Sequence, residues 1–118
     1  MLRLARRRGA VLDLHGEYDL SRGEEIDTTI AAAIGGRVSR LAVDLGDVTF
    51  LDCYSISLLL RGQRLAAAHG TRMYVVNAIN PLVRRVLDLT GAATVLQPPA
   101  HADKPVAAPP HGGRPAAA

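Results

Sequence analysis

The sequence predicts an α/β fold, a small mixed β-sheet of about four to five strands packed with about three α-helices. Short apolar runs alternate with longer segments of helical periodicity, the order expected when helices connect the strands of one sheet. A length of 118 residues allows one domain with a real core. The composition, with 48% hydrophobic and 21% charged residues, indicates a globular protein.

Residues 41–60 organise the prediction. The run at 41–45 is apolar except for Asp44, which is typical of a buried strand, and the turn-forming residues 46–49 end it. Beyond Asp52 the apolar spacing changes to that of a helix, predicted from about Cys53 to Ala68. Asp52 stands where a helix N-cap belongs.

The other elements follow from local signals. Ser21 with Glu24 three residues later has the pattern of a capping box, and Asn80 followed by Pro81 is typical of a helix start. The predicted order is an edge strand at 1–5, a charged turn at 6–9, a strand at 11–14, a helix from Ser21 to the glycines at 35 and 36, the strand and helix described above, a strand at 72–77, a helix from Pro81 to Gly91 and a short last strand at 94–96.

The C-terminal segment differs from the rest in composition. Residues 98–118 contain six of the seven prolines and lack leucine, isoleucine and aromatic residues. Such a segment cannot bury enough apolar surface to fold. We therefore expect a domain at 1–97 followed by a disordered Pro/Ala-rich tail at 98–118.

Charge and composition argue against several classes of function. The formal net charge is +3, but residues 9–97 carry eight basic and ten acidic side chains, so the excess comes from the ends of the chain. Without interleaved basic and aromatic residues, no nucleic-acid partner is expected. No apolar run is long enough for membrane insertion and no signal-peptide core is visible, so we expect a cytoplasmic protein.

No catalytic or cofactor pattern is visible. The single cysteine excludes an internal disulfide, and the four histidines lack the spacing of metal ligands, so neither a metal nor a cofactor is expected. There is no nucleophile motif, phosphate-binding glycine loop or dinucleotide fingerprint. An enzyme is therefore not expected.

The entrance of the predicted helix at Asp52 is the strongest candidate site. Unpaired N–H groups and the helix dipole stabilise an anion there, whether a thiolate at Cys53 or a phosphate ester at Ser55 or Ser57. The alternative for Cys53 is a small, inert, half-buried residue, and for the serines it is local hydrogen bonding to the backbone. Asp19 and Asp52 suggest an acid and base pair or, more simply, two capping residues.

Three segments resemble the STAS domain family of anti-sigma factor antagonists. Residues 43–52 (VDLGDVTFLD), followed by a helix that opens with small polar residues, resemble the family signature. Residues 14–19 (LHGEYD) resemble an upstream family element, and residues 78–87 (AINPLVRRVL) its late helix, followed by a matching exit at 89–91. The similarity runs from about Val11 to Leu96.

The resemblance implies a protein that works by binding. An unmodified antagonist of this family docks on an anti-sigma factor, usually an ATP-binding serine kinase, and so releases the sigma factor. The kinase phosphorylates the serine that follows the aspartate matching Asp52, and the charge breaks the complex. That serine falls on Cys53 here, so the usual off-switch should be absent.

We expect a docking face built from Gly16, Glu17, Asp19, Asp52, Cys53, Tyr54 and Ser55. Tyr54 replaces a usual serine or threonine, and Ser55 and Ser57 stand where glycines are common. Ser55 is a possible alternative phosphosite. Other hypotheses are a redox switch at Cys53, or a scaffold subunit of a transporter or signalling complex, and a homodimer stays open.

Overall fold

A single four-stranded sheet forms the centre of the domain. The computed structural model describes residues 2–4 and 9–99. Strand β1 (Leu2–Leu4) pairs antiparallel with β2 (Gly9–Tyr18), whereas β2, β3 (Arg40–Leu51) and β4 (Arg72–Val76) are parallel neighbours. The strand order is β1-β2-β3-β4. This mixed sheet confirms the predicted fold class.

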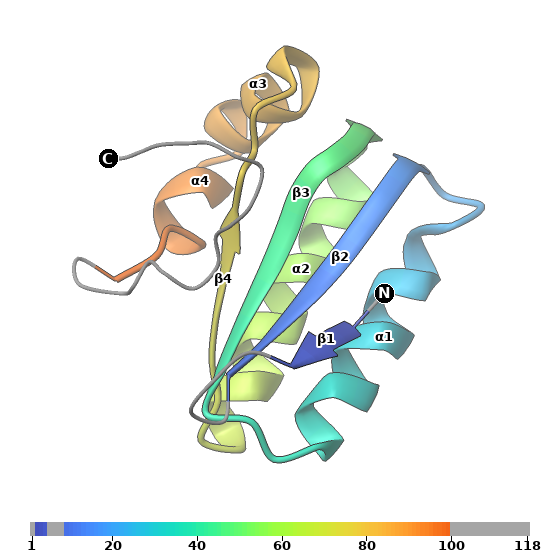
Figure 1. Cartoon of the computed structure of the whole chain (residues 1–118). Helices are drawn as coiled ribbons and strands as arrows, with labels where there is room; N and C mark the ends of the chain where they lie inside the picture. The colour runs from blue at the N-terminus through green and yellow to red at the C-terminus, as the bar shows by residue number, and fades with distance from the viewer. Residues whose placement is uncertain (1, 5–8, 100–118) are drawn as a thin grey trace.

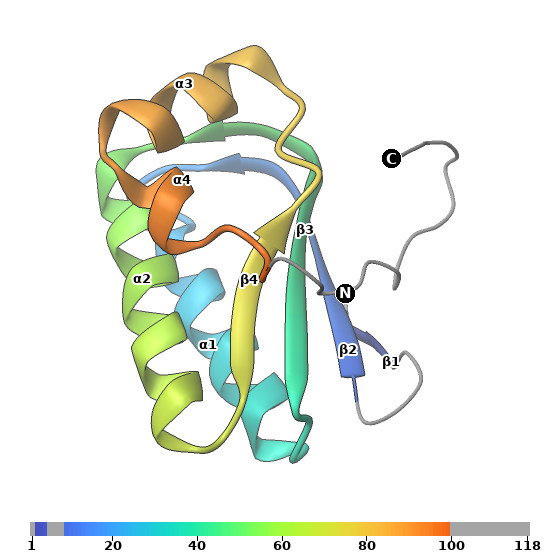
Figure 2. The ribbon, with the colours of Figure 1, turned by 90° about the vertical axis from the view of Figure 1, so that its left-hand side faces the viewer.

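The helices connect the parallel strands. Helix α1 (Gly23–Gly35) joins β2 to β3, and α2 (Cys53–Ala68) joins β3 to β4. Helices α3 (Pro81–Leu89) and α4 (Ala92–Val95) follow β4. Figures 1 and 2 show the helices together on one side of the sheet.

The parallel strands place three junctions along one edge. The chain leaves β2, β3 and β4 at their C-terminal ends and enters α1, α2 and α3 there, at the top of Figure 1. We call these three junctions the C-terminal edge. It is the place where a parallel sheet brings together loops from different parts of the chain.

The main core lies between the sheet and the helices. Alternate strand residues and one stripe of each long helix point into it, as the two side-chain periods require. Burying each large side chain stabilises the fold by roughly 1.5–3 kcal/mol. The largest fully buried side chains include Leu12, Ile26, Ile30, Leu41, Leu45, Leu51, Leu59, Leu87 and Leu96.

The predicted turn at residues 46–49 is wrong, because β3 continues without a break to Leu51. The strand instead carries two irregularities: its register against β2 shifts between Asp13 and His15 and again between Gly16 and Glu17. Asp44 accepts a hydrogen bond from the Gly46 N–H at 2.8 Å. The turn-forming residues thus shape bulges in the part of β3 that pairs with β2, whereas the pairing of β3 with β4 ends at Asp44.

Two other local predictions are wrong. Helix α1 begins at Gly23, with Arg22 as N-cap and no side-chain cap, so Ser21 does not form a capping box. The predicted last strand at 94–96 is the end of α4. The Leu96 N–H donates to the Ala92 carbonyl at 2.9 Å, which is the backbone hydrogen bond of a helical turn, and both residues are buried.

The remaining predicted elements agree with the structure within one or two residues, apart from the strand at 11–14, which extends to Gly9 and Tyr18. Asn80 caps α3 by accepting hydrogen bonds from the N–H groups of Leu82 and Val83, and Pro81 is the first helical residue. Of the charged turn predicted at 6–9, Gly9 is the first residue of β2 and residues 6–8 lie outside the described residues, as does most of the tail, residues 100–118. The domain boundary at 97 therefore stays a prediction.

A search for membrane-crossing segments in the described part of the chain finds no helix with the required length and apolarity.

Helices α1 and α2 pack closely at Gly62, which generates the first prediction. A Cβ at this buried position would lie 2.8 Å from Cδ1 and 3.1 Å from Cγ2 of Ile30. Gly62→Val should therefore lower the free energy of unfolding by about 1–3 kcal/mol, measured by urea denaturation. The matched control is Gly35→Val, where an added Cβ has no neighbour within 4 Å. Equal losses of stability in the two variants would contradict this packing.

Candidate functional site at the entrance of α2

Asp52 caps the N-terminus of α2, as predicted. Its backbone is extended, with φ −97° and ψ 175°, and its carboxylate accepts a hydrogen bond from the Ser55 N–H at 2.8 Å. Its carbonyl oxygen accepts the Ile56 N–H at 3.0 Å, which starts the helical ladder. The carboxylate and the carbonyl oxygen of Asp52 thereby hold the first turn of α2 in place.

The entrance residues divide between surface and interior. Cys53, the first residue of α2, is exposed, Tyr54 is 37% exposed and Asp52 is half-buried. Ser55, in contrast, is fully buried at 0% exposure. Ser55, which we expected on the docking face, therefore does not reach the surface.

The Tyr18 carbonyl oxygen explains the burial of Ser55. This oxygen accepts the Ser55 hydroxyl at 3.0 Å and the Asp52 N–H at 3.2 Å. Ser55 therefore has a structural role and offers no accessible hydroxyl for phosphorylation in this fold. Ser57 is exposed, and its hydroxyl donates to the Tyr54 carbonyl at 2.6 Å. This is the local hydrogen bond to the backbone that the sequence offered as the alternative to a phosphorylation site.

The β2–α1 junction lies next to this entrance. Gly16 and Glu17 belong to β2 and not to a loop, and Glu17 pairs with Phe50 in the sheet. The chain turns at Asp19, whose carbonyl accepts the Arg22 N–H at 3.0 Å and the Gly23 N–H at 2.7 Å. Glu17 and Asp19 are exposed, so this junction presents two carboxylates beside Cys53 and Tyr54.

Hydrogen bonds also hold the Asp19 side chain. One carboxylate oxygen accepts the Ser21 hydroxyl at 2.6 Å and the Ser21 N–H at 2.9 Å. These bonds favour the ionised form and lower the pKa of the Asp19 carboxyl. Asp19 and Asp52 each have a local partner, which agrees with capping and turn roles and gives no support for an acid and base pair.

Arg22 is a structural residue of this junction that sequence reasoning missed. Its guanidinium lies 4.4 Å from the centroid of the Tyr18 ring and donates to the Glu17 carbonyl at 3.1 Å. It also forms two bonds to the Glu25 carboxylate, at 3.0 and 3.1 Å, which lower the pKa of that carboxyl. The i, i+3 spacing of Arg22 and Glu25 was the available signal.

The glycine at position 23 brings α1 against α2. A Cβ at Gly23 would lie 2.9 Å from the Tyr54 ring, so Tyr54 packs directly on the start of α1. The β2–α1 junction and the α2 entrance consequently form one continuous surface. This surface contains five of the predicted docking residues, Glu17, Asp19, Asp52, Cys53 and Tyr54. Of the other two, Gly16 is half-buried and Ser55 is fully buried.

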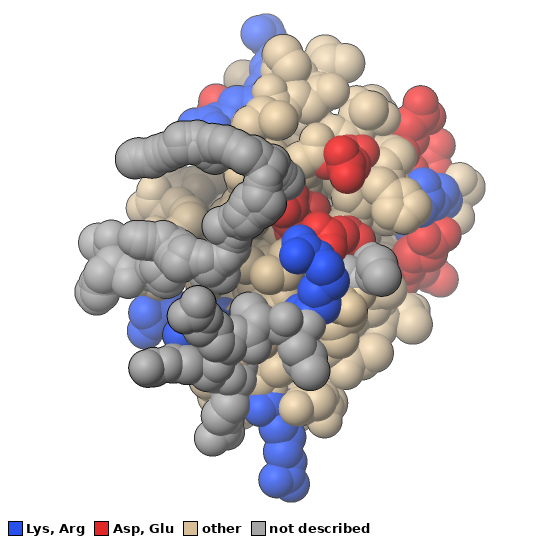
Figure 3. All heavy atoms as spheres, viewed as in Figure 1, with Lys and Arg blue, Asp and Glu red and all other residues tan. Residues whose placement is uncertain are grey.

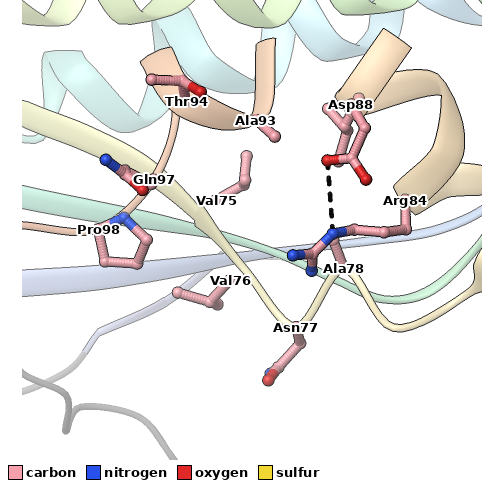
Figure 4. A pocket seen from close by; sticks show the side chains of 11 residues that line it. Val75, Val76, Asn77, Ala78, Arg84, Asp88, Ala93, Thr94, Gln97 and Pro98 are labelled. Carbon is pink, nitrogen blue, oxygen red and sulfur yellow. Dashed lines mark ion pairs between the residues drawn. The ribbon is translucent and has the colours of Figure 1, made fainter. Parts of the chain in front are cut away.

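A separate hollow lies beside the β4–α3 junction. It has a volume of about 530 Å³ and is bounded by β4, α3 and α4, with the Arg84–Asp88 ion pair (3.6 Å) at its rim (Figure 4). Its lining contains none of the predicted site residues. No three His, Cys, Asp or Glu side chains in the described ranges are grouped so that they could hold a metal ion.

The protein is thus a small α/β domain with three junctions at one sheet edge and an exposed helix entrance among them. The family model described as "Mlab, STAS domain" matches residues 2–98. The chain therefore belongs to the STAS domain family, which confirms the resemblance seen in the sequence. A comparison with curated proteins finds no match.

Solved structures give the same result. The chain is 28% identical to the anti-sigma factor antagonist SpoIIAA in its unphosphorylated form, with a TM-score of 0.68 and coverage of 80% of this chain and 82% of that one. For phosphorylated SpoIIAA of Bacillus the values are 26%, 0.62, 82% and 86%. An anti-sigma factor antagonist from Mycobacterium paratuberculosis, 20% identical with a TM-score of 0.65 and 81% coverage of each chain, shares the fold.

The buried bond between Ser55 and Tyr18 predicts a stability effect. Ser55→Ala leaves the Tyr18 carbonyl without one of its two donors and should lower the free energy of unfolding by about 1–2 kcal/mol in urea denaturation. Ser57→Ala, in the same helical turn but exposed, should change it by less than about 0.5 kcal/mol. Indistinguishable variants would show that the hydroxyl of Ser55 does not hold the two elements together.

The bonds to Asp19 predict a pH effect. Because its pKa is lower in the folded chain, these bonds stabilise the fold above the ordinary carboxyl pKa of about 3.9 and are lost as the pH falls through the folded value. Ser21→Ala should raise the Asp19 pKa in an NMR titration, whereas Ser57→Ala should leave it unchanged. An Asp19 pKa insensitive to Ser21→Ala would contradict the assignment.

Proposed function

We propose that this chain is an anti-sigma factor antagonist that docks on an anti-sigma factor through the entrance of α2 and the adjoining β2–α1 junction. The observation that carries the proposal is the exposed pair Cys53 and Tyr54, held beside Glu17 and Asp19. Membership of the STAS family and the likeness to SpoIIAA support it. Docking would free a sigma factor, so the protein acts by binding and without catalysis, in the cytoplasm.

The partner is an anti-sigma factor of the ATP-binding serine kinase class. SpoIIAA has been solved in both unphosphorylated and phosphorylated forms. By the family pattern, the position that receives the phosphate is Cys53. A thiol is not the hydroxyl that a serine kinase uses, and Ser55 is buried. The antagonist is therefore not silenced by phosphate at the helix entrance.

Binding and phosphorylation of two variants test this proposal. Each anti-sigma factor of the kinase class from the source organism is purified and titrated with the wild-type chain by calorimetry, then incubated with it and ATP. At least one should bind and leave residue 53 unmodified in mass spectrometry. Cys53→Ser should bind equally well, accept phosphate at residue 53 and then lose affinity at least tenfold, because the phosphate adds about two negative charges.

Cys53→Ala is the control, with neither thiol nor hydroxyl, and should bind without accepting phosphate there. Failure of every factor to bind would refute the proposed docking. Phosphate on the Cys53 sulfur of the wild-type chain would refute the proposed lack of regulation.

A further inference from the structure

Large apolar side chains gather at the C-terminal edge beyond the predicted docking residues. Five of the nine large hydrophobic side chains exposed in the described ranges belong to its three junctions. We call these five the apolar band: Leu20 (73% exposed), Phe50 (40%), Tyr54 (37%), Ile79 (73%) and Leu82 (61%). Exposed apolar side chains are ordinary when scattered singly, but a group at one edge marks an interaction surface.

The sheet topology places the band on one edge. Leu20 follows β2, Phe50 and Tyr54 flank the start of α2, and Ile79 and Leu82 lie between β4 and the first turn of α3. Because β2, β3 and β4 are parallel, these junctions are neighbours at the top of Figure 1. The band thus extends the proposed docking face across β3 to α3.

The side chains of the apolar band are not needed to fill the hydrophobic core. Neighbouring positions in the same elements are fully buried: Leu51 beside Phe50, and Val83 beside Leu82, are exposed by 1% and 0%. The domain has therefore filled its core with adjacent residues and left the band outside. Exposing these apolar side chains to water is unfavourable in free energy, and a bound partner would cover them.

Charge identifies the kind of partner. Glu17, Asp19 and Glu24 are exposed at the β2–α1 end, and Figure 3 shows acidic side chains gathered there. The guanidinium of Arg22, the nearby cation, is bound to Glu25. The α3 end of the band carries Arg84, which is ion-paired with Asp88, and the exposed Arg85. Unbalanced acidic charge is therefore concentrated at the β2–α1 end of the band, which orients a partner.

We infer that the apolar band docks a protein segment that has an apolar centre and places lysine or arginine side chains over Glu17, Asp19 and Glu24. In naming that partner as the anti-sigma factor, this inference rests on the proposed function. The contact consequently includes Ile79 and Leu82 of the β4–α3 junction, which the sequence did not assign to any site.

Two leucines of α3 give a matched test. Leu82 lies in the band, whereas Leu89, 74% exposed, is at the opposite end of the same helix. Leu82→Gln should weaken binding of the anti-sigma factor found in the titration by about tenfold, and Leu89→Gln by less than twofold. Both variants keep a good helix former at an exposed site, so the fold should be retained. Equal effects would overturn the inference.

Salt tests the charge assignment. Affinity for the same factor should fall between 50 and 300 mM NaCl, and Glu17→Gln should reduce that fall, because the charges at this end are exposed and screened. An unchanged salt dependence in Glu17→Gln would overturn the inferred basic partner.

A probe without any anti-sigma factor separates the inference from the proposed function. The ¹⁵N-labelled full chain is titrated with an 18-residue helical peptide that has leucine on one face and lysine on the other. Amide shifts at the band, with none from the matching leucine and glutamate peptide, support the inference even if no anti-sigma factor binds. Equal shifts from both peptides, or shifts mainly outside the band, would overturn it. A concentration-dependent dimer that Leu82→Gln abolishes would do so too, because it would assign the band to a second copy.

Discussion

The carbonyl oxygen of Tyr18 is the point on which the candidate site depends. It ends β2 and accepts two donors from the start of α2, the Asp52 N–H and the Ser55 hydroxyl. A buried carbonyl needs such partners, and here they come from a segment more than thirty residues away. The bonds fix the helix entrance to the sheet, so that the position of Cys53 is set by β2 as much as by β3.

The hydrogen bond between Ser55 and the Tyr18 carbonyl also determines which residues of the first turn of α2 are buried and which are exposed. With Ser55 anchored inward, Cys53 and Tyr54 are left at the surface, and the Tyr54 ring rests on Gly23 at the start of α1. Arg22, bound to Glu25 and to the end of β2, keeps the adjoining turn in place. A rigid surface of this kind suits recognition of another protein, because little conformational freedom is lost on binding.

In the proposed function, Cys53 stands at the position that receives a phosphate in the family. The residue occupies the first position of α2, where the helix dipole favours an added negative charge. The fold thus retains the electrostatic setting that would stabilise a phosphate ester, but the side chain there is a thiol. Under the proposed function, docking depends on the shape of this surface, whereas regulation by phosphate depends on one atom of residue 53.

Much of the fold could be predicted because its signals are local. The bounds of α2 follow from Asp52 and the apolar spacing after it, and the start of α3 follows from Asn80 and Pro81, since caps and helical stripes involve residues a few positions apart. The family resemblance rested on similar short segments. The sequence also placed Cys53 at the helix entrance but left its exposure open, and the structure shows it exposed.

Contacts between distant segments decided the rest. Residues 46–49 have turn chemistry, yet pairing with the distant strand β2 keeps them in β3 as bulges. In the sequence, Ser55 resembles an ordinary first-turn serine. In the structure, its hydroxyl donates to the Tyr18 carbonyl at the end of β2, which makes it a buried structural residue. The apolar band has no sequence signature, because its members come from three junctions that only the parallel sheet makes neighbours. Local sequence therefore determined the elements and the helix entrance, whereas tertiary packing determined which of their residues are buried and which are exposed.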